Sequence, residues 1–172
     1  MIRWDGGSAL FTQPRVGRNS EIFACYKFRS MVLDAERALD EICASDPKIA
    51  AEWKLYQKLA DDPRITRIGR ILRKTSLDEL PQIINVFKGD MSLVGPRPFL
   101  PSQREIYDAA GGQAYYRLRP GVTGLWQVFS RHDTTFPTRV RYDEAYGASP
   151  SVTGDLSLIL RTAKVVLTRT GA

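Results

Sequence analysis

The sequence is poor in the residues that build metal centres and nucleophilic triads. Its 172 residues include one histidine, His132, and two cysteines, Cys25 and Cys43, in different segments. No CxxC pair or cysteine–histidine cluster is present, so no zinc site is suggested, and the single histidine excludes multi-histidine metal centres. His132 lies in a polar stretch without a nucleophile-elbow motif, which argues against a Ser-His-Asp hydrolase. The few cysteines are most simply explained by a reducing cytosol.

Long apolar runs and the common nucleotide-binding loops are missing too. No run approaches 18 consecutive apolar residues, so the sequence predicts no membrane-spanning helix among these residues. Neither GxxxxGK[ST] nor a GxGxxG following a strand occurs, which excludes the usual phosphate cradles of nucleotide-binding domains.

Positive charge is what the chain has in excess, with 25 basic against 19 acidic residues and a net charge of +6. Arginine outnumbers lysine, and its planar fork grips phosphate through two hydrogen bonds. A phosphate-bearing partner is therefore favoured, whether nucleic acid, a nucleotide or an anionic membrane surface. A basic surface that only keeps the protein soluble is the alternative.

The hydrophobic patterning predicts an α+β fold, a helix-rich single domain over 1–172 with a small β-hairpin. Asp61-Asp62-Pro63 is predicted to stop one helix and to cap the next. The predicted elements are an extended segment forming one arm of a hairpin (21–33), helices (34–44, 47–60, 64–74 and 76–88), a helix broken at Gly111-Gly112 (102–118), a turn and strand (119–130), a helical piece (138–146) and a terminal helix (155–168).

Residues 64–74 form a regular amphipathic segment. Apolar residues fall on one side, and Arg64, Arg67, Arg70 and Arg73 recur every three residues on the other. Such a helix either covers the core with a solvated polar face or lies on anionic lipid with its arginines at the head groups.

The sharpest candidate site is the acidic pair Asp78-Glu79 in Ser76-Leu77-Asp78-Glu79-Leu80-Pro81-Gln82. Ser76 with Glu79 three residues later matches a helix capping box, which is a purely structural interpretation. Two adjacent carboxylates beside several arginines also match phosphoryl transfer. In that chemistry an acid attacks phosphorus or holds Mg²⁺ while arginines neutralise phosphate oxygens.

Two further basic features are candidate phosphate contacts. Lys27 and Arg29 would point to the same side of a strand and could grip one ligand, or else protect an edge strand by their charge. Gly95-Pro96-Arg97-Pro98 places Arg97 on a rigid loop, either as a simple chain reversal or as a preorganised clamp for phosphate or lipid.

Three stretches together resemble one known family: KFRSM (27–31), DPRITRIGRILRKTSLDELPQIINVFKGDMSLVGPRP (62–98) and RPGVTGLWQV (119–128). They are similar to the bacterial sugar transferases. These are polyprenyl-phosphate hexose-1-phosphate transferases, or monotopic phosphoglycosyl transferases, which initiate exopolysaccharide and O-antigen assembly. The resemblance runs from about residue 10 to the C-terminus.

The resemblance implies transfer of a hexose-1-phosphate from a UDP-sugar to undecaprenyl phosphate with Mg²⁺ as cofactor. Asp78 matches the family's nucleophile, which forms a phosphosugar-enzyme intermediate and releases UMP, and Glu79 matches the residue implicated in holding Mg²⁺ with it. The residues in family motifs that are implied to contact phosphate are Lys27, Arg29, Arg70, Arg73 and Arg97. Pro96 and Pro98 are implied to meet the lipid side.

The family also implies a place at the cytoplasmic face of the bacterial inner membrane, peripheral or monotopic. Its members normally begin with a hydrophobic re-entrant segment, and this chain is expected to start just after that segment. The family continues WQV with Ser-Gly-Arg, whereas Phe129-Ser130-Arg131 stands here, which is expected to alter a turn near the sugar or nucleotide.

Two other functions are kept as alternatives. A non-catalytic basic module of a polysaccharide assembly system would bind anionic vesicles regardless of Asp78. Nucleic-acid binding would show a strong salt dependence, but no aromatic stacking motif or recognised nucleic-acid fold supports it, so we expect no nucleic-acid partner. The sequence is compatible with an oligomer.

Overall fold

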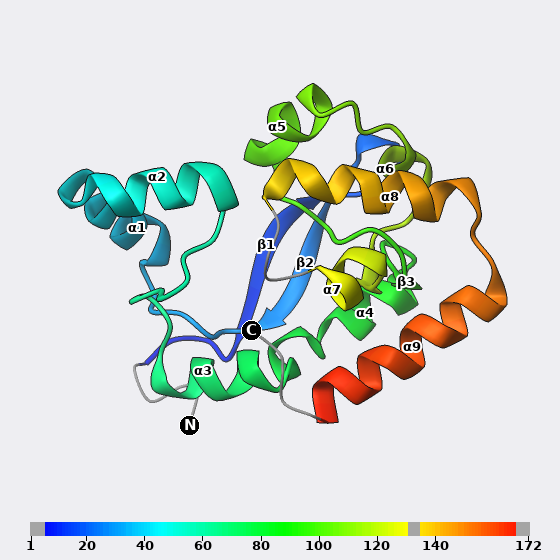
Figure 1. Cartoon of the computed structure of the whole chain (residues 1–172). Helices are drawn as coiled ribbons and strands as arrows, with labels where there is room; N and C mark the ends of the chain where they lie inside the picture. Colours follow the sequence, from blue (N-terminus) through cyan, green and yellow to red (C-terminus); the bar gives the residue numbers. More distant parts are fainter. Residues whose placement is uncertain (1–5, 131–134, 168–172) are drawn as a thin grey trace.

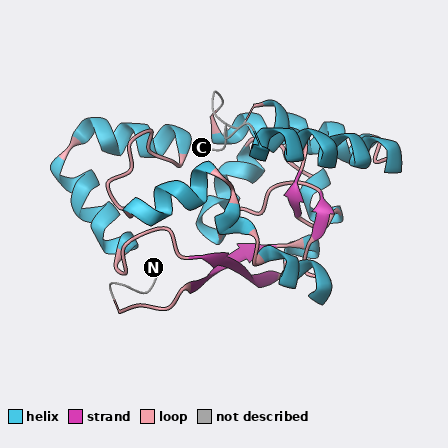
Figure 2. Ribbon diagram, turned by 90° about the horizontal axis from the view of Figure 1, so that it is seen from below, coloured by secondary structure: helices cyan, strands magenta, loops and turns pink. Residues whose placement is uncertain are grey.

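The computed structural model describes residues 6–130 and 135–167, with side chains up to residue 164. Helices predominate, and two small two-stranded sheets complete the described part (Figures 1 and 2). Its elements are, in chain order, β1 (Leu10–Val16), η1 (Arg18–Ser20), β2 (Ile22–Phe28), α1 (Ala35–Ser45), α2 (Pro47–Tyr56), α3 (Arg67–Lys74), η2 (Leu77–Glu79), α4 (Gln82–Lys88), β3 (Ser92–Val94), η3 (Pro101–Gln103), α5 (Arg104–Ala109), α6 (Ala114–Arg117), β4 (Gly121–Thr123), α7 (Leu125–Phe129), η4 (Phe136–Thr138), α8 (Arg139–Ala148) and α9 (Val152–Leu167).

The predicted α+β class and the small hairpin are confirmed. β1 and β2 pair antiparallel, with Leu10 opposite Phe28 and Arg15 opposite Phe23. In Figure 2 most of the helices lie to one side of this hairpin. In the part of the chain that is described, no helix is both long and apolar enough to cross a membrane.

The two helices α1 and α2 form an arm at the left of Figure 1. Asp46 lies between them and accepts a hydrogen bond at Oδ1 from the backbone N–H of Lys48 (2.8 Å), so it caps α2, while Pro47 occupies the first turn as predicted. The helix ends at Tyr56 because Gln57 adopts the left-handed conformation (φ 55°), four residues earlier than the sequence predicted.

The prediction that an aspartate of Asp61-Asp62-Pro63 caps the following helix is wrong. The cap is Thr66, whose Oγ1 accepts a hydrogen bond from the backbone N–H of Gly69 (2.9 Å), so α3 begins at Arg67. Asp62 instead receives two hydrogen bonds from the Arg64 side chain, at 2.8 and 2.6 Å. The guanidinium of Arg64 also lies 5.3 Å from the ring centre of Trp53 on α2. The ion pair thus connects the arm of α1 and α2 to the segment that precedes α3.

We expect Asp62→Asn to lower the free energy of unfolding by about 3 kcal/mol at pH 7, because it leaves the buried Arg64 without its charge partner. Burial raises the pKa of Asp62, but the hydrogen bonds and charge of Arg64 outweigh it and lower the pKa overall. The carboxylate therefore stabilises the fold fully above its unfolded-state pKa of about 3.9, and this contribution is lost as the pH falls through the lower folded-state value.

Denaturant unfolding at pH 7 and at pH 3 would measure this effect. The exposed Asp61→Asn is the matched control and should change the stability little. An equal loss in both variants would contradict the assignment.

The second sheet is parallel and pairs β3 with β4. It needs glycine, because a Cβ on Gly121 would lie 2.1 Å from the nitrogen of Gly95, and one on Gly124 would lie 2.1 Å from the Gly95 carbonyl oxygen. The strand predicted over 119–130 is correct only at 121–123. At Gly124 the chain turns against Gly95, and the remainder forms α7.

The main apolar core lies among the C-terminal helices and reaches the end of β1. Phe99 stacks on Tyr107 with ring centres 4.8 Å apart, and it packs against Tyr115 at 4.5 Å. The buried residues of this cluster are Val16, Phe99, Tyr107, Tyr115, Phe136 and Val140. The helix predicted over 102–118 divides into α5 and α6 around Gly111-Gly112, as its break predicted.

The terminal helix α9 is confirmed, and only part of it lies in the core. Leu158 is buried, whereas Leu156 and Leu160 are 55% and 72% exposed. The helix follows the outer edge of the molecule at the lower right of Figure 1, which leaves one apolar stripe facing outward.

Candidate active site

The acidic pair lies in a break between two helices, not in the continuous helix predicted over 76–88. Ser76 lies between α3 and η2 in the left-handed conformation (φ 55°), and its side chain makes no capping hydrogen bond. The capping-box interpretation is therefore wrong. Asp78 and Glu79 belong to the short η2 turn before Pro81, and each is only 7% exposed.

Glu79 is held between two cations from distant segments. Lys27 Nζ on β2 donates to its Oε1 at 3.0 Å, and Arg97 Nη2 donates to the same oxygen at 2.6 Å. Arg97 Nη1 reaches the other oxygen, Oε2, at 3.4 Å. The fold thus brings together three residues that the sequence identified separately.

The surroundings change the protonation of both cations. Burial lowers the pKa of Lys27 although Glu79 acts in the opposite direction. Burial also disfavours the charged form of Arg97, but the charge and hydrogen bonds of Glu79 outweigh it and raise the pKa of Arg97. The cluster therefore keeps Arg97 firmly charged, while Lys27 loses its proton more easily than an ordinary lysine.

Replacing Lys27 with Arg is expected to extend activity to higher pH. As the pH rises through the lowered pKa of Lys27, the ammonium becomes neutral and Glu79 loses a charged partner. A guanidinium stays protonated throughout this range. The pH profile of turnover should therefore fall at a higher pH in Lys27→Arg than in the wild type. An unchanged alkaline limb would show that another group sets it.

The three other predicted cations lie in different surroundings. Arg73 on α3 donates from Nε to Ser30 Oγ at 2.9 Å. Burial lowers the pKa of Arg73, and the charge of Asp78 opposes this, so Arg73 lies within the electric field of the acidic pair. Arg70 is exposed on α3, and Arg29, beyond the end of β2, donates from Nε to the carbonyl of Ser8 at 2.8 Å. Phosphate contacts by these residues remain predictions.

The proline-rich loop leaves the side chain of Arg97 partly exposed, whereas its two prolines are buried. Pro96 and Pro98 are buried, while the side chain of Arg97 is 23% exposed and turned to Glu79. Contact of the two prolines with lipid remains a prediction from the family resemblance.

The sequence interpretation did not place Arg15 in this site. Arg15 lines a narrow polar pocket with Lys27, Glu79, Gln82, Arg97 and Pro98. Burial lowers the pKa of Arg15 to about 10, with the nearby charge of Arg97 acting in the same direction. The alternation of side chains along a strand could have pointed to Arg15, because Arg15 and Lys27 lie on the same face of the hairpin. That alternation identifies a shared face only once the register of the two strands is known.

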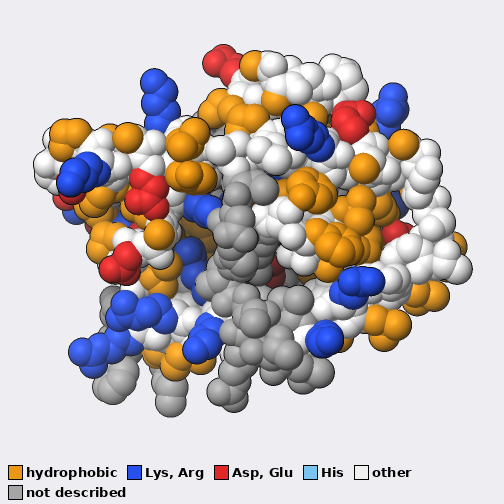
Figure 3. Space-filling view, in the orientation of Figure 1, with side chains coloured by type: hydrophobic (Ala, Val, Ile, Leu, Met, Phe, Trp, Pro, Cys, Tyr) orange, Lys and Arg blue, Asp and Glu red, His pale blue; other side chains and the backbone are white. Residues whose placement is uncertain are grey.

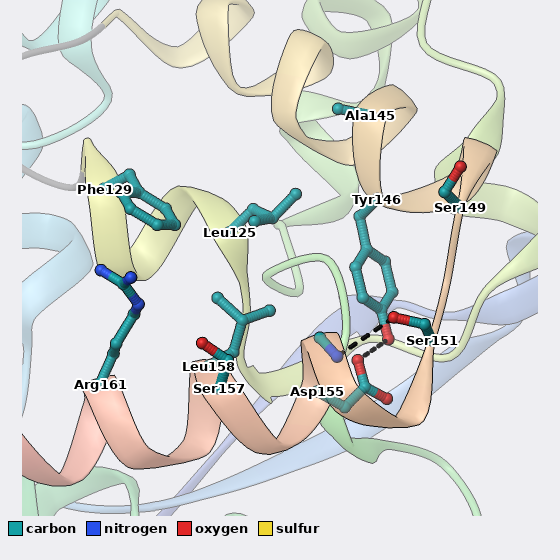
Figure 4. Close-up of a pocket in the computed structure, with 11 residues that line it drawn as sticks. Leu125, Phe129, Ala145, Tyr146, Ser149, Ser151, Asp155, Ser157, Leu158 and Arg161 are labelled. Carbon is teal, nitrogen blue, oxygen red and sulfur yellow. Dashed lines mark hydrogen bonds between the residues drawn. The ribbon is translucent and has the colours of Figure 1, made fainter.

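A larger cavity, of about 230 Å³, lies apart from these residues between α7, α8 and α9 (Figure 4). Leu125, Phe129 and Leu158 form its apolar part, and Tyr146 donates to Asp155 at 3.0 Å within it. None of the predicted site residues lines it. In the segment Phe129-Ser130-Arg131, which differs from the family sequence, Ser130 lies at the end of α7 and Arg131 is outside the described residues. The expected effect of this difference on a turn therefore stays a prediction.

Similarity to known proteins decides the family. A model described as bacterial sugar transferase matches residues 1–169. The chain belongs to the bacterial sugar transferase family. The family resemblance carried by the three sequence stretches is thereby confirmed.

Several bacterial proteins are similar to this chain over nearly all of its length. The undecaprenyl-phosphate galactose phosphotransferase of Salmonella typhimurium is 51% identical over 98% of this chain and 35% of its own. The exopolysaccharide production protein ExoY of Sinorhizobium fredii is 44% identical over 98% of this chain and 74% of the ExoY sequence. The UDP-glucose:undecaprenyl-phosphate glucose-1-phosphate transferase of Caulobacter vibrioides is 39% identical over 96% of this chain and 59% of the Caulobacter sequence. The chain thus spans about a third of the length of the Salmonella protein.

Proposed function

We propose that this chain is the catalytic part of a phosphoglycosyl transferase. It would move a hexose-1-phosphate from a UDP-sugar to undecaprenyl phosphate, the first step of exopolysaccharide or O-antigen assembly. The names of two relatives pair undecaprenyl phosphate with galactose or with glucose, and one of them includes UDP-glucose. The observation that carries the proposal is a buried carboxylate, Asp78, next to a second one that is held by Lys27 and Arg97.

The proposed reaction has two displacement steps. A carboxylate oxygen of Asp78 attacks the β-phosphorus of the donor. The bond from that phosphorus to the bridging oxygen breaks, and UMP leaves with the electron pair. An oxygen of undecaprenyl phosphate then attacks the phosphosugar-enzyme and frees the Asp78 carboxylate. Division into two steps lets the water-soluble donor leave before the lipid acceptor reacts.

The basic residues of the site supply the charge that this reaction needs. Arg97 and Lys27 lie beside the acidic pair and, with Arg73 nearby, can neutralise phosphate oxygens as negative charge moves to the leaving group. Burial of the acidic pair keeps water from the reacting carboxylate.

A magnesium ion fits these residues. The described residues contain no cluster of three or more acidic, histidine or cysteine side chains, so a metal cage built from protein alone is not formed there. Mg²⁺ commonly binds through one or two carboxylates together with substrate phosphates, and Asp78 and Glu79 offer two carboxylates. When bound, the ion would neutralise the charge of the diphosphate.

We further propose that α3 and α4 lie on the cytoplasmic face of the bacterial inner membrane. Next to the acidic pair, Leu80, Ile83, Ile84 and Phe87 repeat at helical spacing and are 42–86% exposed. Basic side chains gather at the lower left of Figure 3, where Figure 1 places α3. An apolar stripe flanked by cations suits an anionic lipid surface, which would bring a lipid acceptor to Asp78.

Vesicle flotation tests the membrane proposal. The chain should bind vesicles that contain phosphatidylglycerol, less so at high salt, and Phe87→Ser should weaken binding several-fold through loss of buried apolar area. Leu55→Ser is the control, because this residue is 51% exposed on α2, in the arm. Equal weakening by both variants would contradict the assigned face.

The proposed activity is tested by UMP release. The chain is incubated with Mg²⁺, undecaprenyl phosphate in detergent and UDP-galactose, UDP-glucose or an N-acetylated donor. Donor-dependent UMP release that EDTA stops is the expected result. No release with any donor, but salt-sensitive vesicle binding that is indifferent to Asp78, would support the non-catalytic alternative.

A further inference from the structure

The loop that carries Arg97 is held through three successive backbone carbonyls. The carbonyl of Pro96 accepts a hydrogen bond from the backbone N–H of Gly121 on β4 at 2.8 Å. The carbonyl of Arg97 accepts one from Arg139 Nη2, and the carbonyl of Pro98 accepts one from Arg15 Nη1 at 3.3 Å. Three elements that are distant in sequence thus hold the loop. Because proline has no N–H, the backbone of this loop forms hydrogen bonds mainly through its carbonyl groups.

Arg139 makes the middle contact from inside the core. It is 2% exposed at the start of α8, and its guanidinium carbon lies 5.3–5.8 Å from the ring centres of four aromatic residues. The aromatic residues around it are Phe99, Tyr107, Trp126 and Phe136. One turn further along α8, Asp143 balances the charge, with Oδ2 at 3.5 Å from Arg139 Nε.

Packing alone does not account for an arginine at this position. Removing a cation and a carboxylate from water is unfavourable, and apolar residues of similar volume often replace such a pair without loss of stability. What an apolar side chain cannot do is donate a hydrogen bond to the carbonyl of Arg97. The charged pair is therefore best explained by what Arg139 does for the loop.

We propose that Arg139 is a positioning residue that holds the backbone of Arg97 so that its side chain meets Glu79 and the substrate phosphate. The part that concerns the substrate rests on the proposed function. Arg139 donates to the carbonyl of Arg97, and Glu79 accepts from its guanidinium, so Arg97 is fixed at both its backbone and its side chain. A displacement of about 1 Å in such a group can cost about 100-fold in rate.

The test variant is Arg139→Met combined with Asp143→Asn. It removes both charges together, and the side-chain oxygen of the new amide can still accept the hydrogen bond that Tyr107 donates to Asp143 at 3.0 Å. The thermal midpoint should stay near that of the wild type, while turnover with UDP-sugar falls 10- to 100-fold. Arg139→Lys, which keeps a donor, should retain more activity and serves as the second variant if the first does not fold.

A double-mutant cycle separates positioning from a general effect on the core. In an Arg97→Ala background, loss of Arg139 should cause no further loss of turnover, because Arg139 acts only through Arg97. Losses that multiply, or a folded variant with wild-type turnover, would overturn the proposal.

A readout without activity keeps the proposal separate from the proposed function. In the ¹⁵N NMR spectrum, the guanidinium nitrogens of Arg97 should give separate signals in the wild type, since both Nη atoms are hydrogen-bonded to Glu79. They should average in the folded Arg139 variant. Unchanged Arg97 signals in that variant would overturn the positioning role, even if the wild type released no UMP at all.

Discussion

Asp78→Asn should abolish formation of the covalent intermediate and reduce turnover by about 10⁴-fold or more, the scale expected when a covalent nucleophile is removed. The amide has the shape of the carboxylate but is a far weaker nucleophile. Intact-protein mass spectrometry after brief exposure to Mg²⁺ and UDP-sugars is the measurement. The wild type should gain the mass of one hexose phosphate, and the variant should gain nothing.

Two controls make this result specific. Asp40→Asn changes an exposed acid on α1, and it should form the adduct like the wild type. Thermal unfolding should show that Asp78→Asn is folded. An adduct on Asp78→Asn at the wild-type rate would place the nucleophile elsewhere, and UMP release by the wild type without any adduct would favour a single displacement.

Glu79→Gln should have the second largest effect, because it affects both stability and catalysis. Lys27 and Arg97 would lose the carboxylate between them, and water could replace it only in part because their side chains are only 19% and 23% exposed. Removing one partner from a largely buried ion pair costs about 3 kcal/mol, so the thermal midpoint should fall markedly. Turnover should fall as well, since Arg97 loses the group that orients it.

An added anion distinguishes this explanation from a general folding defect. Inorganic phosphate should raise the thermal midpoint of Glu79→Gln more than that of the wild type, because the vacated cations would bind it in place of the carboxylate. Glu105→Gln is the exposed control and should respond like the wild type. No phosphate effect in the folded Glu79 variant would contradict the view of Lys27 and Arg97 as an anion site.

Local patterns predicted those elements whose boundaries are set by local chemistry. The Pro47 start of α2, the break at Gly111-Gly112 and the terminal helix agree with the structure, since helix starts, breaks and amphipathic faces depend on neighbours within a few residues. Two capping predictions were wrong because other cationic partners bind the carboxylates. Asp62 binds Arg64, two residues further along the chain, instead of capping α3. Glu79 binds Lys27 and Arg97, which are distant in sequence, instead of forming a capping box with Ser76.

The sequence by itself determined the chemistry of this protein: a carboxylate pair, an excess of arginine, a rigid loop carrying Arg97, and motifs long enough to identify the family. Only the tertiary structure decided which of these groups meet. Lys27 and Glu79 are 52 residues apart, and Arg97 lies 18 residues beyond Glu79. Arg15 and Arg139 join the loop through strand register and core packing. Such contacts depend on how whole elements pack against each other, and residue type and spacing along the chain do not encode that packing locally.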